Sequence, residues 1–325
     1  MPTKNNINTN DISVVVQGPI DKCITSKCLE KIRKLIIGAE IILSTWEGSD
    51  VTGLDYDKVV FSKDPGGFKD RMNASFFNNT LRQLISTEAG IKVCNRKYIL
   101  KMRSDIILKS LDFLKYIGRY SVREKNFIFF KNKVIISSFF TKRYLSHNNI
   151  IQPVPFHISD WIAFGTNEDI KKLYCLELPK EPYFSWYFTF NNYDYKKINL
   201  LNCSHQYAPE QYIMTKAFSK QYDLNFINYM DYNEKNIKLS NDLIQNNFII
   251  LDPWQFRFIS GKVKNGRDYY QRWSKFEFCI PRNLWNGLYT NYVYEKKYSL
   301  IDREFKIEFS KKIKHKILKF IHIFY

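Results

Sequence analysis

Short apolar runs alternate with amphipathic segments along the first third of the chain. The runs rich in β-branched residues, which favour strands, are 11–20, 39–46, 58–62 and 98–108. The segments whose apolar residues recur at helical spacing are 23–36 and 78–90, with Gly90 expected to end the second helix. The order strand, helix, strand, strand, helix, strand predicts an α/β fold with a mostly parallel, Rossmann-like sheet flanked by helices.

The run YILKMRSDIIL at 98–108 combines an apolar strand pattern with three charges. Lys101, Arg103 and Asp105 are two residues apart, so a strand would place them on one face. Two cations and a carboxylate on one face suit a diphosphate with a bound divalent cation. The alternative is a salt-bridged polar face on a strand near the edge of the sheet.

Polar or glycine-rich residues follow the predicted strands. They are Gln17-Gly18-Pro19, Thr45-Trp46-Glu47, Asp64-Pro65-Gly66-Gly67 and Arg103-Ser104-Asp105. In open α/β sheets ligands bind beyond the carboxyl ends of the strands, so we expect these residues to line one crevice. The helix over 78–90 presents Asn79, Arg82 and Ser86 on one side, which could look into the same crevice. An ordinary Pro-Gly turn and a solvated helix face are the structural alternatives.

The second half of the chain has a different pattern. Residues 127–140 are expected to form strands, Gly165 a turn, and residues near 167–175 a helix. A further helix is expected to begin at Pro209-Glu210, because proline suits the first turn of a helix.

Neither an internal repeat nor a low-complexity linker interrupts the chain, which favours one continuous domain. We divide it into a donor-binding half at 1–150, an acceptor-binding half at 151–304 and a tail at 305–325. The tail predicts a basic amphipathic helix, because its apolar residues fall on one helical arc and its lysines lie off it. Such a helix suits an anionic membrane surface, and the alternative is a helix docked on the protein's own core.

The charge balance of the chain is strongly basic. Fifty Lys and Arg against 32 Asp and Glu leave a net charge of +18. A surplus of this size attracts nucleic acid, phosphorylated substrates or a membrane surface. Zinc-finger, helix-turn-helix and RNA-stacking signatures are missing from the sequence, which disfavours the first of these partners.

Cysteine usage and hydropathy indicate the compartment. The six cysteines are scattered, without a C-x-x-C pair, and are expected to be reduced thiols in the cytosol. The polar N-terminus is unlike a signal peptide, and no apolar run is long enough to span a membrane. We therefore expect a soluble or peripheral protein.

Several motifs of the chain resemble those of the WavE lipopolysaccharide-synthesis family. They are VVVQGPI (14–20), AEIILSTWEGSD (39–50), LDYD (54–57), DPGG (64–67), RQLIST (82–87), KMRSD (101–105) and PFHISDW (155–161), with Phe164-Gly165. They occur in that order over roughly residues 12–170. The resemblance implies a bacterial glycosyltransferase with a GT-A-like fold that acts in surface-polysaccharide assembly.

The resemblance also implies a nucleotide-sugar site at the strand ends. Its expected residues are Gln17, Gly18, Pro19, Trp46, Asp64, Gly66, Asn79, Arg82, Lys101, Arg103 and Ser104. Asp105 would stand where the fold places the metal-binding carboxylate of a D-x-D motif, holding Mg²⁺ or Mn²⁺. The sequence departs from that motif because position 103 is Arg. Arg103 and Lys101 could therefore stabilise the departing phosphate with or without a metal ion.

An inverting sugar transfer needs a base for the acceptor hydroxyl. The candidates are Asp160, in HISDW, and Glu210, in HQYAPEQY. The alternatives are a helix or turn cap for Asp160 and a residue that complements the helix dipole for Glu210. His157 and His205 are expected to be structural or hydrogen-bonding residues.

Aromatic side chains are frequent in the second half of the chain. Trp161, Trp186, Tyr187 and Trp254 could stack on sugar faces, and core packing is the alternative.

These features together predict a hexosyl- or pentosyltransferase that is peripheral on the inner face of the cytoplasmic membrane. It would move a sugar from a nucleotide-sugar donor onto a lipid-linked or growing surface glycan of lipopolysaccharide or capsule. One alternative is a transferase that adds a phosphoryl-linked substituent to such a glycan. A second alternative is a nucleic-acid-binding module.

Overall fold

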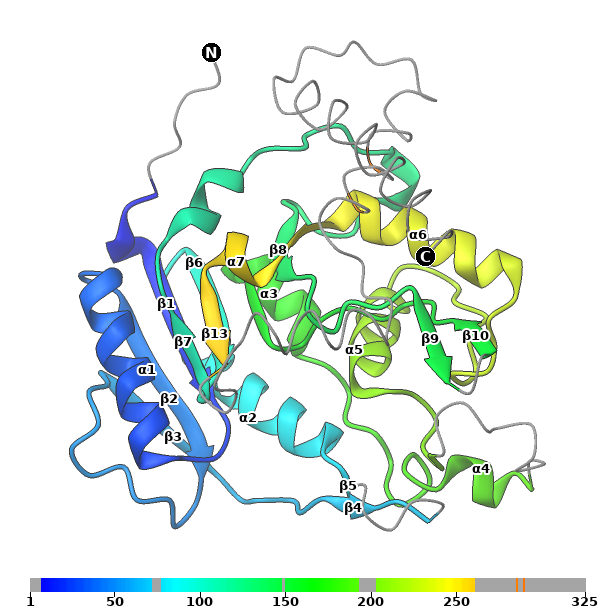
Figure 1. The fold of residues 1–325 in the computed structure, drawn as a ribbon, viewed down its shortest axis with the longest axis horizontal. Helices are drawn as coiled ribbons and strands as arrows, with labels where there is room; N and C mark the ends of the chain where they lie inside the picture. Colours follow the sequence, from blue (N-terminus) through cyan, green and yellow to red (C-terminus); the bar gives the residue numbers. More distant parts are fainter. Residues whose placement is uncertain are drawn as a thin grey trace, which may run out of the picture.

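A seven-stranded sheet forms the centre of the molecule, in the order β12-β8-β11-β6-β1-β2-β3 (Figure 1). The computed structural model describes residues 7–71, 77–147, 150–192 and 203–260, together with Trp285 and Tyr289. The strands of the sheet are β1 (Ile12–Gln17), β2 (Glu40–Trp46), β3 (Lys58–Ser62), β6 (Tyr98–Arg103), β8 (Val134–Ser137), β11 (Ile162–Thr166) and β12 (Phe248–Leu251). The predicted α/β class with a mostly parallel, Rossmann-like sheet is confirmed.

One strand of the sheet runs against the others. β1 is parallel to β2 and β6, β2 to β3, and β8 to β12. β11 is antiparallel to both of its neighbours, β6 and β8. The chain before Ile162 therefore lies at the edge where the other strands end, beside Gln17, Trp46 and Arg103.

Helices flank the sheet. They are α1 (Lys22–Leu35), α2 (Thr80–Lys92), α3 (Asn167–Tyr174), α4 (Tyr187–Phe190), α5 (Pro209–Phe218), α6 (Glu234–Asn247) and α7 (Pro253–Phe256). α2 packs on β1 and β2, α3 on β6 and β11, and α1 on β2. α5 begins at Pro209, as the sequence predicts, and α3 begins after Thr166, whose side chain accepts from the Asp169 backbone N–H.

Gly90 has a different role from the one expected of it. The helix α2 continues past it to Lys92. A Cβ atom at residue 90 would lie 2.5 Å from Val15 Cγ1 and 3.0 Å from Ser44 Cβ. The missing side chain therefore lets α2 lie directly on β1 and β2.

The run 98–108 is two strands and not one. β6 ends at Arg103, and β7 (Ile106–Leu108) pairs with β13 (Phe258–Ser260) in a separate antiparallel ribbon. The Ser104 N–H still donates to the carbonyl of Gln17 at 2.9 Å, which extends the ladder between β6 and β1 by one bond. The Ser104 hydroxyl then donates to the carbonyl of Pro19 at 2.7 Å, and the chain turns. Ser104 and Asp105 are thus placed in a turn at the end of the central strand.

Two other expectations for the second half were wrong. Only residues 134–137 of the run 127–140 form a strand, β8. Gly165 lies within β11 and not in a turn. A Cβ atom there would lie 3.3 Å from Val134 and 3.4 Å from Ile170, so glycine allows β8 and α3 to pack closely on β11.

Two further antiparallel ribbons lie outside the main sheet. β4 (Phe68–Lys69) pairs with β5 (Phe77–Asn78), and β9 (Tyr144–His147) pairs with β10 (Ile150–Pro153). The β4–β5 ribbon leads directly into α2, so it sits beside the carboxyl edge of the sheet.

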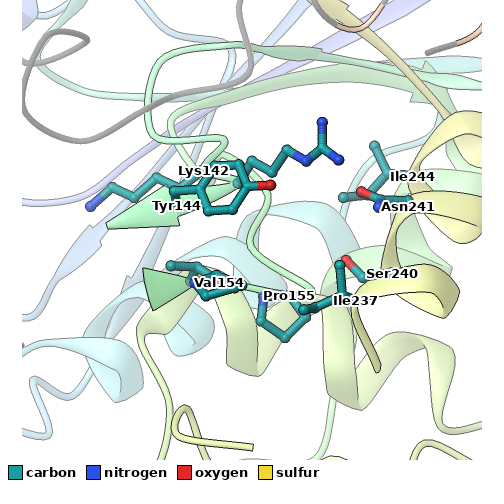
Figure 2. Close-up of a pocket in the computed structure, with 10 residues that line it drawn as sticks. Lys142, Tyr144, Val154, Pro155, Ile237, Ser240, Asn241 and Ile244 are labelled. Atoms are coloured by element: carbon teal, nitrogen blue, oxygen red, sulfur yellow. The ribbon is translucent and has the colours of Figure 1, made fainter. Parts of the chain in front are cut away.

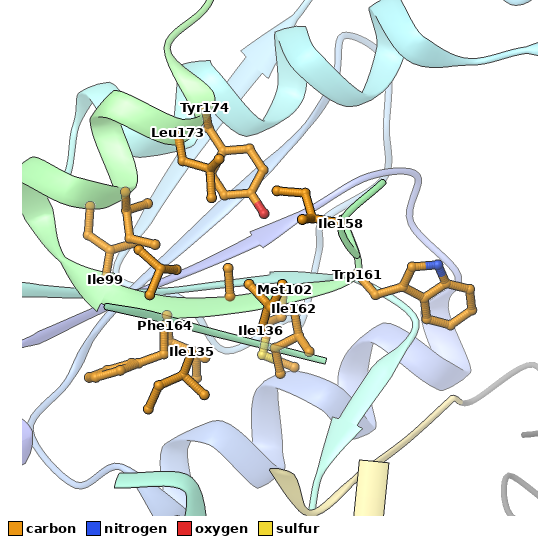
Figure 3. Packing of buried hydrophobic residues seen from close by; sticks show 14 of the residues in the cluster. Ile99, Met102, Ile135, Ile136, Ile158, Trp161, Ile162, Phe164, Leu173 and Tyr174 are labelled. Atoms are coloured by element: carbon orange, nitrogen blue, oxygen red, sulfur yellow. The ribbon is translucent and has the colours of Figure 1, made fainter. Parts of the chain in front are cut away.

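The core lies on both sides of β6 and β11. On one side of these strands Ile99 is buried with Leu173 of α3. On the other side Met102 and Phe164 are buried, with the Phe164 ring 5.2 Å from that of Phe113 (Figure 3). Fully burying an aliphatic side chain stabilises a fold by roughly 1.5–3 kcal/mol, so this cluster fixes the positions of the central strands. Trp161 lies at the rim of the cluster, just before β11 (Figure 3).

Some predicted features lie on residues that the structure does not describe. Others are predictions that the structure does not test. The basic helix expected at 305–325 lies outside the described residues. The main sheet takes strands from both 1–150 and 151–304, and the division into donor and acceptor halves stays a prediction. Cys23, Cys28, Cys94, Cys175 and Cys203 are free thiols, as expected, and Cys279 lies outside the described residues. Within the described ranges no helix has the length and apolarity needed to cross a bilayer.

Candidate functional site

Several of the residues predicted to line a crevice lie at the carboxyl edge of the sheet, where β1 ends. Gln17 closes β1, and its Oε1 accepts a hydrogen bond from the Ser86 hydroxyl of α2 at 2.7 Å. Gly18 follows with φ +121°, a conformation that favours glycine, and a Cβ there would lie 3.2 Å from the Ser104 hydroxyl. The structure thus brings together the ends of β1 and β6 and the polar side of α2, as the sequence predicts.

The Asp64-Pro65-Gly66-Gly67 turn is joined to the start of α2 by an ion pair. Arg82 donates from Nε and Nη2 to the two oxygens of Asp64, each at 2.7 Å, and from Nη1 to Asn79 Oδ1 at 3.2 Å. These hydrogen bonds from Arg82 lower the pKa of Asp64. Asp64 Oδ1 also accepts from the Gly66 N–H at 2.9 Å. Four of the residues predicted to bind the donor therefore form one connected cluster.

Arg103 and Asp105 form the charged centre of the edge. The guanidinium binds the carboxylate in a bidentate manner, with Nε to Oδ1 at 2.9 Å and Nη2 to Oδ2 at 2.7 Å. The ring of Trp161 lies 4.2 Å from the guanidinium carbon and also stacks on Phe140. Asp105 is nearly buried, whereas 30% of the Arg103 side chain is exposed. Arg103 therefore keeps a fixed, partly exposed positive charge at this edge of the sheet.

Lys101, which was expected to contact the diphosphate of the donor, is enclosed by the protein. Its side chain is fully buried, and its ammonium donates to the backbone carbonyl of Asp160. The ring of Tyr174 lies 5.2 Å from the same nitrogen. Burial lowers the pKa of Lys101 from 10.5 to about 8, against the opposing effect of Asp160. In this structure Lys101 positions the segment before β11, and its expected contact with the donor stays a prediction.

The two candidate bases lie near the Arg103–Asp105 pair. Burial alone would lower the pKa of Arg103, but Asp105, and beyond it Asp160 and Glu210, raise that pKa. The two carboxylates predicted from different parts of the chain are thus within electrostatic range of one guanidinium.

Asp160 and Glu210 have different surroundings. Asp160 is 8% exposed, and its Oδ1 is a buried oxygen without a hydrogen-bond partner among the described residues. Glu210 stands in the first turn of α5, with an oxygen 3.9 Å from His157 Nε2. Burial holds the pKa of His157 well below its usual range, so this imidazole is neutral. A buried oxygen such as Asp160 Oδ1 normally accepts a hydrogen bond, which a ligand or a water molecule would have to donate here.

The remaining predicted residues are more scattered. Trp46 ends β2 and is half-buried, and Pro19 follows Gly18 at the end of β1. Of the aromatic residues expected to stack on sugars, Trp161 lies against the charged centre. Tyr187 is buried, and Trp254 is 45% exposed on α7.

Potential metal ligands gather at a place that the sequence did not indicate. Asp70, Cys203 and His205 are all buried, and one ligand atom of each lies within 4.8 Å of the others. Asp105, the predicted metal ligand, belongs to no such group among the described residues. The sequence contains a Cys-x-His motif at 203–205. This motif alone does not indicate a metal site, because the third ligand, Asp70, is distant in the sequence.

A hollow of about 280 Å³ lies between the β9–β10 ribbon and α6 (Figure 2). Its lining residues are Lys142, Arg143, Tyr144, Pro153, Val154, Pro155, Ile237, Ser240, Asn241 and Ile244. The Lys142 N–H donates to the carbonyl of His157 at 3.2 Å, so the hollow adjoins the segment that carries the candidate base Asp160.

The fold and the edge define a class of protein. It is a Rossmann-like α/β protein with a guanidinium–carboxylate pair and further carboxylates where the central strands end. The family model for WavE lipopolysaccharide synthesis matches residues 12–322, so the chain belongs to that family. Membership implies that the protein is a biosynthetic enzyme of lipopolysaccharide synthesis. No curated protein matches the chain.

Proposed function

We propose that the protein is a glycosyltransferase that moves a sugar from a nucleotide-sugar donor onto a lipid-linked or growing glycan in lipopolysaccharide synthesis. The observation that supports it is the proximity of Arg103 to three carboxylates at the carboxyl edge of the sheet. Edges of this kind bind nucleotides in other open α/β sheets. The family membership supplies the pathway.

In the proposed reaction the donor's diphosphate faces Arg103. The bond between the anomeric carbon and the phosphate oxygen breaks, and the nucleoside diphosphate leaves with the bonding electrons. A fixed guanidinium stabilises the charge that develops on that oxygen. Asp105 holds the guanidinium in place through the two hydrogen bonds described above.

A carboxylate takes the proton of the acceptor hydroxyl as its oxygen bonds to the anomeric carbon. We assign this role to Asp160, because its buried Oδ1 lacks a partner among the described residues. The Lys101 ammonium holds the backbone of Asp160 and so fixes the start of this side chain. Glu210 is the second candidate, and its place beside His157 suits contact with the acceptor.

The hydrogen bonds between Arg103 and Asp105 determine how a divalent cation would bind at Asp105. Mg²⁺ or Mn²⁺ at Asp105 would compete with Arg103 for the same two oxygens. A cation that assists the donor would therefore shift Arg103 toward the phosphates, where it can form charge-assisted hydrogen bonds.

The proposal is tested by calorimetric titration of the full-length protein with a panel of nucleoside diphosphates, with and without Mn²⁺. We expect one nucleotide to bind in the micromolar range and Arg103→Ala to weaken it at least tenfold. Arg257→Ala, which removes a 54% exposed arginine paired with Asp112, is the matched control and should leave binding unchanged. If every nucleotide binds more weakly than millimolar, the donor site is wrong.

The mass of the product separates the two transferase hypotheses. A hexose or pentose increment on the acceptor supports sugar transfer, and a phosphate-containing increment supports the transfer of a phosphoryl-linked substituent. Tight, salt-sensitive binding of DNA without nucleotide binding would instead favour the nucleic-acid-binding alternative.

A further inference from the structure

Asp70, Cys203 and His205 meet between two segments that are far apart in the sequence. Asp70 directly follows β4, and Cys203 and His205 precede α5. All three are buried, with exposed fractions of 4%, 6% and 4%. A buried carboxylate loses its contact with water and needs hydrogen-bond donors or a cation in exchange.

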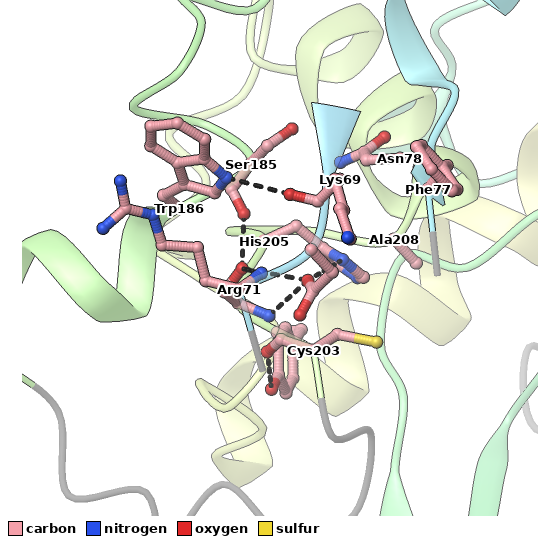
Figure 4. Close-up of polar contacts among 12 residues, drawn as sticks. Lys69, Arg71, Phe77, Asn78, Ser185, Trp186, Cys203, His205 and Ala208 are labelled. Carbon is pink, nitrogen blue, oxygen red and sulfur yellow. Dashed lines mark hydrogen bonds and ion pairs between the residues drawn. The ribbon is translucent and has the colours of Figure 1, made fainter. Parts of the chain in front are cut away.

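Hydrogen bonds connect the two segments that carry the three residues (Figure 4). The Ser204 N–H donates to Asp70 Oδ2 at 2.7 Å, and the Ser204 hydroxyl lies 2.9 Å from the same oxygen. The Tyr229 hydroxyl donates to the carbonyl of Cys203 at 3.1 Å, and its ring centroid lies 5.9 Å from that of His205. The hydrogen bond from the Ser204 N–H to the Asp70 carboxylate is of the kind that orients ligating carboxylates in protein metal sites.

The spacing of the ligand atoms is close to that of a tetrahedral site. Zinc bond lengths of about 2.0–2.3 Å put neighbouring ligand atoms about 3.3–3.8 Å apart. The distance from His205 Nδ1 to Asp70 Oδ2 is 4.0 Å, and the three ligand atoms lie within 4.8 Å of one another. A contraction of about 1 Å, which small side-chain rotations can supply, would close the site.

The donor set selects the kind of cation. Thiolate and imidazole ligands favour zinc and similar transition metals, whereas Mg²⁺ and Mn²⁺ favour oxygen ligands. Burial raises the pKa of the Cys203 thiol to about 12 and lowers the pKa of His205 to about 4. A bound metal ion deprotonates a coordinating thiol outright.

We propose that Asp70, Cys203 and His205 bind a zinc ion that joins the β4–β5 ribbon to the segment before α5. Three protein ligands leave one position of a tetrahedral ion for water. The segment continues into α5, which carries Glu210 in its first turn. The ion therefore fixes the position of a candidate acceptor-side carboxylate relative to the ribbon beside the donor edge, and it is separate from any cation at Asp105.

The test is the metal content of the full-length protein after expression with added zinc and extensive dialysis. We expect one equivalent of zinc per chain, lost in Cys203→Ser and in His205→Gln. Cys94→Ser is the matched control, because Cys94 is also a buried free thiol, with 4% exposure. Asp105→Ala should keep its zinc, which separates this site from the donor site.

Substitution with Co²⁺ gives a second measurement that does not depend on the variants. The metal-free wild-type protein should show thiolate-to-cobalt charge-transfer absorption on titration and a higher unfolding temperature when loaded. A wild-type protein that retains far less than one equivalent of zinc and gives no such absorption would overturn the proposal. This result would leave the proposed glycosyl transfer untouched, because no donor-site residue takes part.

Discussion

Lys101 and Arg103 are two residues apart on β6, but their cations have different surroundings. Arg103 is partly exposed at the strand end and holds Asp105 with two hydrogen bonds. Lys101 lies one step deeper, is fully buried and donates to a backbone carbonyl. The strand pattern correctly predicted that both face the same side. It could not predict the depth, which depends on α3 and on the segment before β11.

The Arg103–Asp105 pair gives a prediction for a single atom change. Asp105→Asn keeps the volume but removes the charge that holds the guanidinium, so the charged centre loses its geometry. We expect donor binding to fall at least tenfold and the free energy of unfolding to fall by about 1–3 kcal/mol. Titration calorimetry and urea unfolding measure the two effects.

The control is Asp112→Asn, which breaks an exposed Asp–Arg pair with an Nε–Oδ2 distance of 3.1 Å. An exposed pair contributes about 0–1 kcal/mol, so both quantities should change little. Unchanged donor binding in Asp105→Asn would contradict the assignment of the charged centre.

Lys101 predicts a pH dependence of stability. Its pKa falls from 10.5 to about 8 on folding, so between these values the unfolded chain binds more protons at this residue than the folded protein does. The contribution of Lys101 to the free energy of unfolding therefore rises as the pH increases from about 8 toward 10.5, by roughly 2–3 kcal/mol. Lys101→Met removes this contribution and keeps most of the buried volume.

The measurement is the difference in unfolding free energy between the wild-type protein and Lys101→Met across this pH range. The difference cancels other groups, such as the buried thiol of Cys28, whose pKa burial raises to about 12. Asp160, Arg103 and Asp105 affect the charge of Lys101 and are present in both proteins. A difference that does not change with pH would show that Lys101 has an ordinary pKa.

At the scale of single elements, local sequence patterns predicted the bounds of helices and strands best where the pattern within the segment determines its structure. β3 has the predicted bounds, and α1, α2 and α3 lie within two residues of theirs. The errors came at glycines and polar residues. The sequence predicts a helix end at Gly90 and a turn at Gly165, yet both glycines are needed because another element packs directly on them. No local pattern reveals a neighbour that comes from another part of the chain.

Two glycines, one within α2 and one in the turn near its start, predict different effects of the same substitution. Gly90→Ala places a Cβ 2.5 Å from Val15 Cγ1, so α2 must move away from the sheet. Overpacking costs about 1–3 kcal/mol and outweighs the gain of about 1 kcal/mol from replacing a helical glycine. Gly67→Ala places a Cβ 2.8 Å from Asn79 Oδ1, the movable end of a side chain.

We therefore expect Gly90→Ala to lower the unfolding temperature and Gly67→Ala to leave it nearly unchanged. Gly67→Ala should instead weaken donor binding, because Asn79 and Arg82 are displaced from the turn. Thermal unfolding and nucleotide titration on both variants make the comparison. A lower unfolding temperature in Gly67→Ala alone would show that the tight contact is at the turn and not at α2.

At the scale of the whole molecule, the sequence predicted the class of fold and the edge that carries the charged centre. The motifs around Gln17, Asp64 and Arg103 lie at the ends of β1, β3 and β6, and parallel strands end at the same edge. Asp160 reaches that edge because β11 is antiparallel, and neither that direction nor the pairing of β8 with β12 follows from local pattern. The Asp70–Cys203–His205 group was missed for the same reason, since Asp70 is more than a hundred residues from the other two.

The net charge of +18 and the tail at 305–325 predict attachment to an anionic membrane. Each lysine near such a surface contributes about 1 kcal/mol. Replacing Lys311, Lys312, Lys314 and Lys319 by glutamine in the full-length protein should lower binding to phosphatidylglycerol vesicles by roughly a hundredfold or more. Nucleotide binding should stay unchanged, because the donor edge is built from other residues.

The matched control replaces four exposed lysines of the described helices, Lys27, Lys31, Lys34 and Lys92, by glutamine. The two variants have the same net charge, so a general effect of charge would lower vesicle binding equally in both. A selective loss in the tail variant supports a membrane-binding helix, because only a local cluster of charge on one amphipathic segment can align its apolar side with the lipid. Equal vesicle binding by both variants and the wild-type protein would contradict a membrane-binding tail and favour a tail that packs on the protein's own core. A lipid-linked acceptor would then have to reach the active site without membrane attachment through the tail.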